Sequence, residues 1–274
     1  MSLEKQDYVI RTEHVPASEP RGIGKGDYGT IERALIVTEL LKKRETGEWS
    51  VEHARLHPDE FVTKTFHRAT AIENARHSVE CYEALKAAGV THLPGTHRIS
   101  DSDPRVVIST LLGKDALLIT ANFVPENSKR PTEIDDSSFG ELLTHLTDDL
   151  KKMSAQRLVM HYDDAFFFEL RMEGSRAERV QYVIGDFDNI GTESRMSEKE
   201  AFRQNVIQAT RSLFWLMMSQ QVIPGADPES DNWARVASRI QLWADSHGVD
   251  AQEVYDEYVT ELERRIAADR VAHE

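Results

Sequence analysis

The stretch Gly24-Lys25-Gly26-Asp27-Tyr28-Gly29-Thr30-Ile31 opens the part of the chain that decides the fold. Three glycines at this spacing tolerate positive φ, and they let main-chain N–H groups approach the oxygens of a polyphosphate. The stretch by itself is also compatible with an ordinary glycine-rich hairpin. It gains significance from the later motifs, which are in order Val62-Thr63-Lys64, an acidic helix, His161-Tyr162-Asp163, and Asp186-Phe187-Asp188 after an apolar strand.

The composition narrows the class of protein. The chain has 274 residues, which is enough for one large domain or two lobes with a core of their own. Its 47 acidic and 33 basic residues give a net charge of −14, which disfavours nucleic acid and anionic membrane as partners. Cys81 is the only cysteine, so an internal disulfide is excluded and a reducing compartment is expected. With no signal-peptide pattern and no long apolar run, we expect a soluble, cytoplasmic protein.

The first half of the chain has mostly strand-like patterns. Strands are predicted over residues 30–40 and 61–66, and a short strand or an extended arm within residues 1–20. Apolar spacing predicts a helix over residues 70–88, ended by Gly89. Two apolar runs, 105–112 and 116–124, predict a hairpin. Residues 42–58 are charged and irregular, which predicts an inserted loop or a small helix.

The second half is predominantly helical. Amphipathic spacing predicts helices over residues 139–153, 198–219, 233–243 and 254–266, and two short strands, 166–171 and 180–184, lie between the first two. The polar stretch from Pro125 to Pro131 is the best candidate for a boundary. We therefore predict an α+β protein with a sheet-rich lobe, residues 1–124, and a helical lobe, residues 125–274.

The order of these motifs resembles that of the protein-kinase superfamily over roughly residues 20–220. The resemblance implies a two-lobed fold that holds ATP and Mg²⁺ between its lobes. It identifies Gly24, Gly26 and Gly29 with the loop that covers the phosphates. Ile31 then takes the apolar position two residues beyond the last glycine, and Ala34 the small residue against adenine.

Lys64 resembles the family's lysine that contacts the α and β phosphates and pairs with a glutamate of the following helix. Glu80 best fits that partner by its place in the helix, and Glu83 and Glu73 are the alternatives. A lysine on a strand also commonly lies on a solvated face, so the assignment depends on its position between the glycine stretch and the helix.

Residues 120–125 resemble the connection between the two lobes, whose backbone holds the edge of adenine. On this interpretation Ala121 is the residue at the back of the nucleotide site, and Asn122, Phe123 and Val124 form the hinge. The alternative is a plain edge strand that ends at Pro125.

His161-Tyr162-Asp163 resembles the family's His-Arg-Asp, which makes Asp163 the candidate to orient an acceptor hydroxyl and take its proton. The chain departs from the pattern nearby. Phe168 stands where the family has a metal-binding asparagine, and Ala165 replaces a basic residue that steadies the transferred phosphoryl group. Tyr162 replaces the arginine that reads a phosphorylated loop.

Asp186-Phe187-Asp188 resembles the family's Asp-Phe-Gly, so the resemblance implies that Asp186 holds Mg²⁺. The glycine has become Asp188. One hypothesis is that this second carboxylate replaces the missing asparagine as a metal ligand. The alternative is an acid on a surface loop.

The resemblance is compatible with two functions. The segment from Asp188 to a helix near Glu198 is short and has no Ala-Pro-Glu motif, which favours an ATP-dependent phosphotransferase whose acceptor is not a typical protein substrate. Phe168 and Ala165 motivate the alternative, a pseudokinase that acts as a nucleotide-binding or scaffold protein. A third hypothesis is a structural protein in which the motifs are coincidental. The expected partner is a nucleotide, and the charged helix over residues 253–270 offers a surface for a protein partner.

Overall fold

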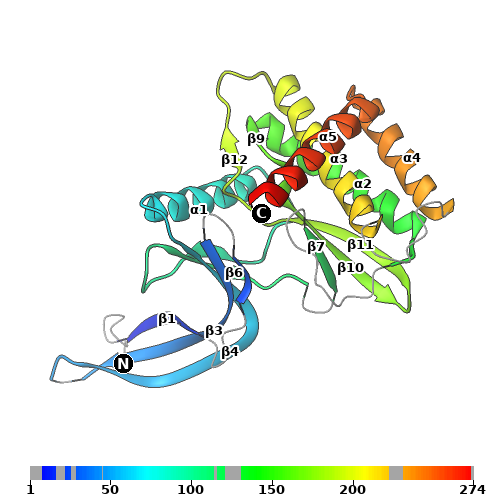
Figure 1. Cartoon of the computed structure of the whole chain (residues 1–274). Coiled ribbons are helices and arrows are strands. Elements are labelled where there is room, and N and C mark those ends of the chain that lie inside the picture. Colours follow the sequence, from blue (N-terminus) through cyan, green and yellow to red (C-terminus); the bar gives the residue numbers. More distant parts are fainter. Residues whose placement is uncertain are drawn as a thin grey trace. The chain divides into compact units, whose positions relative to one another are not determined.

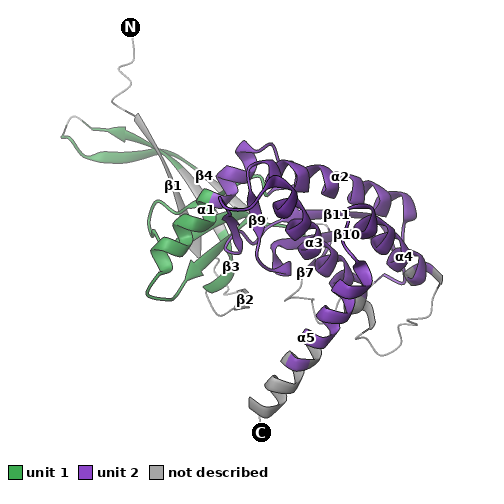
Figure 2. Ribbon diagram, turned by 90° about the horizontal axis from the view of Figure 1, so that it is seen from above, with its two compact units in different colours: residues 1–80, 94–114 green, residues 81–93, 115–274 purple. Residues whose placement is uncertain are grey.

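The computed structural model of the chain describes residues 8–16, 22–25, 29–44, 46–113, 116–120, 131–221 and 231–272. These residues group into two compact units (Figure 2), unit 1 within Met1–Glu80 and Pro94–Lys114 and unit 2 within Cys81–Leu93 and Asp115–Glu274. The predicted lobe boundary between residues 124 and 125 lies outside the described residues and stays a prediction. Strands dominate the N-terminal part and helices the C-terminal part (Figure 1), so the predicted α+β class is confirmed.

Unit 1 is built on a six-stranded sheet with the order β1-β3-β4-β6-β5, in which β2 also pairs with β3. The strands are β1(Tyr8–Pro16), β2(Gly22–Lys25), β3(Gly29–Lys43), β4(Trp49–Phe66), β5(His97–Ile99) and β6(Val106–Thr110). The predicted helix is also present, as α1(Ala71–Ala87), of which the residues up to Glu80 belong to unit 1. Its first residues, Ala71 and Ala75, pack with Phe66 of β4 and Val107 of β6 in a small apolar cluster.

The prediction of a loop or small helix over residues 42–58 is wrong. These residues belong to a long antiparallel hairpin, in which Lys43 pairs with Trp49 and Leu41 with Val51. Trp49 and Val51 are both exposed. A strand whose side chains stay in solvent does not need alternating apolar residues, because neither face packs on a core. The pattern that signals a strand was therefore missing.

Unit 2 contains a four-stranded sheet with the order β7-β10-β11-β8. Its strands are β7(Leu117–Thr120), β8(Glu133–Ile134), β10(Phe166–Glu173) and β11(Arg176–Ile184). β10 and β11 confirm the two strands predicted between the helices, and they form a hairpin. The predicted hairpin of residues 105–124 is wrong, because β6 pairs with β4 and β5 whereas β7 pairs with β10. Apolar content identifies a buried strand but not the sheet to which it belongs.

Four further helices confirm the predicted helical segments: α2(Asp136–Ala155), α3(Glu198–Gln221), α4(Asp231–Ser246) and α5(Ala251–Ala272). In two of them, side chains at the first turn satisfy free N–H groups. Asp135 accepts a hydrogen bond from Ser138 N at the start of α2, and Ser197 and Glu200 form a reciprocal capping box at the start of α3. Among the described residues, no helix has the length and apolarity that a membrane crossing requires.

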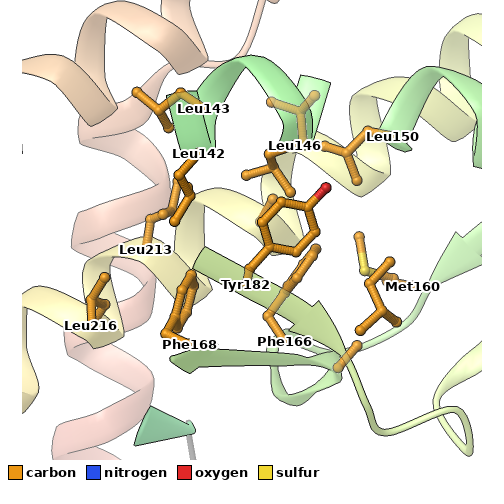
Figure 3. Close-up of a cluster of buried hydrophobic side chains, with 14 of the residues drawn as sticks. Leu142, Leu143, Leu146, Leu150, Met160, Phe166, Phe168, Tyr182, Leu213 and Leu216 are labelled. Atoms are coloured by element: carbon orange, nitrogen blue, oxygen red, sulfur yellow. The ribbon is translucent and has the colours of Figure 1, made fainter. Parts of the chain in front are cut away.

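The main core of unit 2 lies between helix α2 and the β10–β11 hairpin (Figure 3). Leu142, Leu146 and Leu150 recur on one side of α2, where they meet aromatic side chains of the sheet. Leu213 of α3 reaches the same core. Because fully burying a side chain of this size contributes about 1.5–3 kcal/mol, this contact is a main source of the stability of unit 2.

A buried carboxylate lies beside this apolar core. Asp149 of α2 accepts hydrogen bonds from Thr91 N (3.1 Å), His92 N (3.2 Å), His92 Nδ1 (2.8 Å) and Tyr182 Oη (2.8 Å), and Lys152 Nζ lies 3.1 Å from its Oδ1 atom. Burial opposes ionisation of Asp149, but these hydrogen bonds outweigh it and hold the carboxyl pKa well below its ordinary value. Asp149 thereby ties the loop after α1 to α2 and to β11.

Candidate functional site

In unit 2 the residues that carry the resemblance lie on two turns. The first follows β9(Leu158–Met160) and ends in the 3₁₀ helix η1(Asp163–Ala165). Ser212 of α3 donates a hydrogen bond to the carbonyl of Asp163 (2.5 Å). Asn205 of α3 holds the preceding strand, because it accepts from Met160 N (2.9 Å) and donates to the carbonyl of Leu158 (2.9 Å). Helix α3 therefore holds the backbone of Asp163 and of the strand before it in place.

The second turn carries Asp186 and lies against the first. The carbonyl of Ala165 accepts hydrogen bonds from Gly185 N (2.9 Å) and, more weakly, from Asp186 N (3.5 Å). Phe187 is fully buried, and its ring meets the Tyr82 ring edge-on with the centroids 5.5 Å apart. A Cβ atom at Gly185 would overlap the ring of Phe167. The turn therefore needs glycine directly before Asp186.

The end of the second turn is tied back to the first. His161 N donates to the carbonyl of Asn189 (2.9 Å), and the next residue begins β12(Ile190–Thr192), which pairs with β9. His161 itself is exposed, with Nε2 3.7 Å from Glu193 Oε1. Tyr162 is 57% exposed. The turns of Asp163 and Asp186, which are far apart in sequence, are therefore neighbours in unit 2.

Sequence reasoning missed Asp164, the second residue of η1. Its Oδ1 atom accepts a hydrogen bond from Asn189 Nδ2 at 2.9 Å. Burial and the negative charge of Asp186 raise the pKa of Asp164 to about 6, and Asp163 adds to this increase. The doubled acid Asp163-Asp164 was visible in the sequence, but its partner lies 25 residues further on and only the tertiary structure reveals it.

The departures from the kinase pattern have a packing reason. Phe168 is 1% exposed and lies beside Phe166 in the core (Figure 3), and Leu170, two residues further along β10, belongs to the same core. Ala165 is fully buried as well. A carboxamide at position 168 or a basic side chain at position 165 would therefore lie in apolar surroundings, where an unpaired polar group is costly.

Asp188 is partly buried, and its Oδ1 atom is inaccessible to solvent, which does not fit an ordinary exposed loop acid. Within the described residues, no group of three or more His, Cys, Asp or Glu side chains is arranged to hold a metal ion. Mg²⁺ commonly takes one or two carboxylates and completes its shell with water and phosphate oxygens. The acids of the two turns, which Ala165 O and the Asp164–Asn189 bond hold together, include two carboxylates, Asp186 and Asp188, and this number fits Mg²⁺.

Unit 1 holds the residues predicted to contact phosphates. Gly29 lies in β3 opposite Phe66, where a Cβ atom would fall 2.6 Å from the carbonyl oxygen of Thr65. Ile31 pairs with Lys64 across β3 and β4, so the two side chains share one face of the sheet. Lys64 Nζ lies 5.1 Å from the centre of the Phe66 ring, on the same face. This sharing of a face is what a common ligand would require.

The other predicted residues of unit 1 are placed differently. Ala34 is buried, but it comes three positions after Ile31, so strand alternation puts it on the opposite face from Ile31 and Lys64. Val62, two residues before Lys64, shares the face of Lys64 instead. Gly24 pairs with Ile31 through β2. Gly26 lies outside the described residues.

The glutamate that would pair with Lys64 stays a prediction. Glu80, Glu83 and Glu73 are all exposed on α1. A buried polar residue of this helix is Ser78, whose hydroxyl lies 3.0 Å from His97 Nε2. The predicted hinge, Asn122, Phe123 and Val124 with Ala121 before it, lies outside the described residues.

Comparisons with known proteins give similarity by structure only. No protein-family model matches the chain, and the search of curated proteins gives no significant match. Similar solved structures include two of the Rio2 kinase from Chaetomium thermophilum, one of them an ADP/Mg²⁺-phosphoaspartate complex. They share 10% and 11% sequence identity with the chain, each with a TM-score of 0.42, and the match covers 92% of this chain and 72% and 73% of theirs.

A structure of Cex1p is also similar, with 10% identity, a TM-score of 0.36, and coverage of 93% of this chain and 42% of that chain. At these identities and TM-scores, the likeness carries no information about substrates or about individual residues.

Proposed function

We propose that the chain is a divergent protein-kinase-like phosphotransferase that uses ATP and Mg²⁺. The observation that carries the proposal is the meeting of two motifs in unit 2. Ala165 comes directly after the Asp163-Asp164 pair, and its carbonyl accepts hydrogen bonds from Gly185 and Asp186. The two acidic turns, which are separate motifs in the sequence, are thus held side by side. Phosphoryl transfer requires such an arrangement, because the acid that orients the acceptor and the acid that binds the metal act on the same phosphate group.

Each acid has a proposed role. Asp163 orients the hydroxyl of the acceptor and takes its proton as the hydroxyl oxygen bonds to the γ-phosphorus of ATP, whose bond to the bridging oxygen breaks so that ADP leaves. Asp186 holds Mg²⁺, with Asp188 as the second carboxylate in place of the asparagine missing at position 168. Bound Mg²⁺ would neutralise charge on the phosphate oxygens. Because these acids lie on two adjoining turns, their negative charge favours a cation over an additional anion.

The residues of unit 1 complete the proposal. Lys64 contacts phosphate oxygens as a point charge, and Ile31, which shares its face of the sheet, contacts the base or the ribose. Gly24, Gly26 and Gly29 supply main-chain N–H groups, and Asn122, Phe123 and Val124 the adenine contacts. We propose a small-molecule acceptor, because only a short segment containing β12 separates Asp188 from α3.

A second candidate function is a pseudokinase that binds nucleotide without transfer. It is favoured by Phe168 and Ala165, whose buried positions leave no room for the polar side chains expected there. In this case Asp163 would have no catalytic task, whereas the nucleotide contacts would remain.

Two measurements test the proposal. Thermal denaturation with ATP, with and without Mg²⁺, should show stabilisation that depends on the metal, because a ligand that binds the folded state raises its stability. No shift under either condition would contradict nucleotide binding. Transfer of radiolabelled phosphate to the protein itself, to generic proteins and to small metabolites then separates the two functions.

The decisive comparison uses Asp163→Asn with Asp148→Asn as the matched control, since Asp148 is an exposed acid on α2. Loss of the orienting acid should lower transfer on the order of a hundredfold or more and leave nucleotide binding intact. Nucleotide binding without transfer in the wild type would favour the pseudokinase.

A further inference from the structure

One polar contact joins the two acidic turns through side chains. Asp164 Oδ1 accepts a hydrogen bond from Asn189 Nδ2 at 2.9 Å, and both residues are partly buried. Asp164 comes directly after Asp163, and Asn189 is the third residue after Asp186. The contact therefore links the residue after Asp163 to the end of the turn that carries Asp186 and Asp188.

Asn189 lies where the second turn ends and strand pairing begins. Its carbonyl accepts from His161 N (2.9 Å), and the following Ile190 pairs with Met160 in the β9–β12 ladder. At the start of the same turn, the Ala165 carbonyl receives the N–H groups of Gly185 and Asp186. Main-chain bonds thus hold both ends of the turn, and the Asn189 side chain adds a tie to η1.

The interior of the turn is held by side-chain packing and by a main-chain hydrogen bond between residues close in sequence. Phe187 anchors it against Tyr82, and the Phe187 carbonyl accepts from Ile190 N (3.2 Å). The hydrogen bond from Asn189 to Asp164 adds a side-chain contact that resists displacement of this segment relative to η1.

We propose that the Asp164–Asn189 hydrogen bond positions Asp186 relative to Asp163, so that Asp164 and Asn189 are positioning residues of the phosphotransfer site. The inference rests on the proposed function and deepens it. Asp164 acts by accepting the hydrogen bond from Asn189 at its Oδ1 atom. We assign neither residue a contact with the substrate.

The experiment compares the wild type with Asp164→Ala, Asn189→Ala, the double variant and Asp164→Asn. Asp164→Asn is the conservative variant, because its amide oxygen can still accept from Asn189 Nδ2. Ser194→Ala, which changes an exposed polar residue in the same connection to α3, is the matched control. For each protein, the affinity for ATP is measured in the presence and in the absence of Mg²⁺, and amide hydrogen exchange is measured over residues 185–190.

We expect both alanine variants to lose about tenfold or more of the enhancement that Mg²⁺ gives to ATP affinity, with Mg²⁺-free affinity unchanged. Asp164→Asn should retain most of it. The double variant should lose no more than either single variant, because each removes the same bond. Exchange within residues 185–190 should become faster in all three alanine variants and stay at the wild-type rate in Asp164→Asn and Ser194→Ala. A merely stabilising contact would lower the melting temperature without changing the Mg²⁺ dependence.

Failure of the inference and failure of the proposed function give different results. If the wild type binds Mg²⁺ and ATP but the alanine variants match it in affinity and in exchange, the positioning role is overturned while the proposed function stands. If the wild type binds no nucleotide, the proposed function fails, and exchange alone then decides whether the bond holds the turn. Unchanged exchange in both single alanine variants would overturn the inference in that case as well.

Discussion

Replacing Asp149 by alanine is the most informative test of how unit 2 is held together. The substitution removes one carboxylate that serves the loop after α1, helix α2 and strand β11 at once. Tyr182 is 1% exposed, so water cannot replace the acceptor that its hydroxyl loses. The N–H groups of Thr91 and His92 lose the same acceptor.

The size of the expected loss is set by the hydroxyl of Tyr182, which is the buried donor among them, and by the charged cluster around Asp149. Leaving a buried donor without a partner costs about 1–3 kcal/mol, and removing one member of a buried charged cluster typically costs about 3–5 kcal/mol. We therefore expect Asp149→Ala to lower the free energy of unfolding by about 3–5 kcal/mol. For a protein of this size, that corresponds to a decrease in melting temperature of roughly 6–20 °C.

Urea unfolding followed by circular dichroism and tryptophan fluorescence measures this loss. Trp243 reports on α2 directly, because its Nε1 atom donates to Thr147 Oγ1 at 2.8 Å. Asp148→Ala is the control, since it removes a neighbouring but exposed carboxylate from the same helix. The reasoning would be refuted if Asp149→Ala cost less than about 1 kcal/mol, or if the two variants lost equal stability.

Three further predictions concern the two acidic turns. Gly185→Ala should cost about 1–3 kcal/mol in urea unfolding, because its Cβ atom would overlap the Phe167 ring, whereas Gly95→Ala meets only an ordinary contact at 3.4 Å; equal effects would contradict the clash. Asn205→Ala should cost about 2 kcal/mol or more by leaving Met160 N and the Leu158 carbonyl without this partner, with exposed Arg203→Ala as a neutral control. The raised pKa of Asp164 means that its ionisation costs stability as the pH rises from about 4 through about 6, so Asp164→Asn should gain stability over the wild type between about pH 4 and pH 7; a gap that stays constant with pH would contradict this sign.

The pH dependence of Asp149 has the opposite sign. Its folded-state pKa is lowered, so the stability that it contributes is complete above the unfolded value of 3.8 and is lost as the pH falls below it. Urea midpoints measured from about pH 6 down to about pH 3 should therefore fall more steeply in the wild type than in Asp149→Asn. Parallel curves would show that another group governs the acid side.

The sequence determined the helices, because their apolar spacing is a local property. Leu142, Leu146 and Leu150 recur at helical intervals, and Asp135 and Ser197 carry capping signals that need no tertiary context. Strand β10 was equally predictable, since its inward positions alternate, and β11 was predictable from its apolar end, residues 180–184. The motifs around Asp163 and Asp186 were visible because they too are local patterns of residues.

Only the tertiary structure decided which strands pair, because pairing joins residues far apart in the chain and an apolar run does not identify its neighbour. This is why β6 and β7 lie in two different sheets and why the exposed outer part of the β3–β4 hairpin, within residues 42–58, escaped detection. Alternation and register likewise separated Ala34 from Lys64, and the fold brought Asn189 to Asp164. A sequence specifies which side chains can be buried or charged, whereas the distance between two of them is set by the packing of everything that lies between.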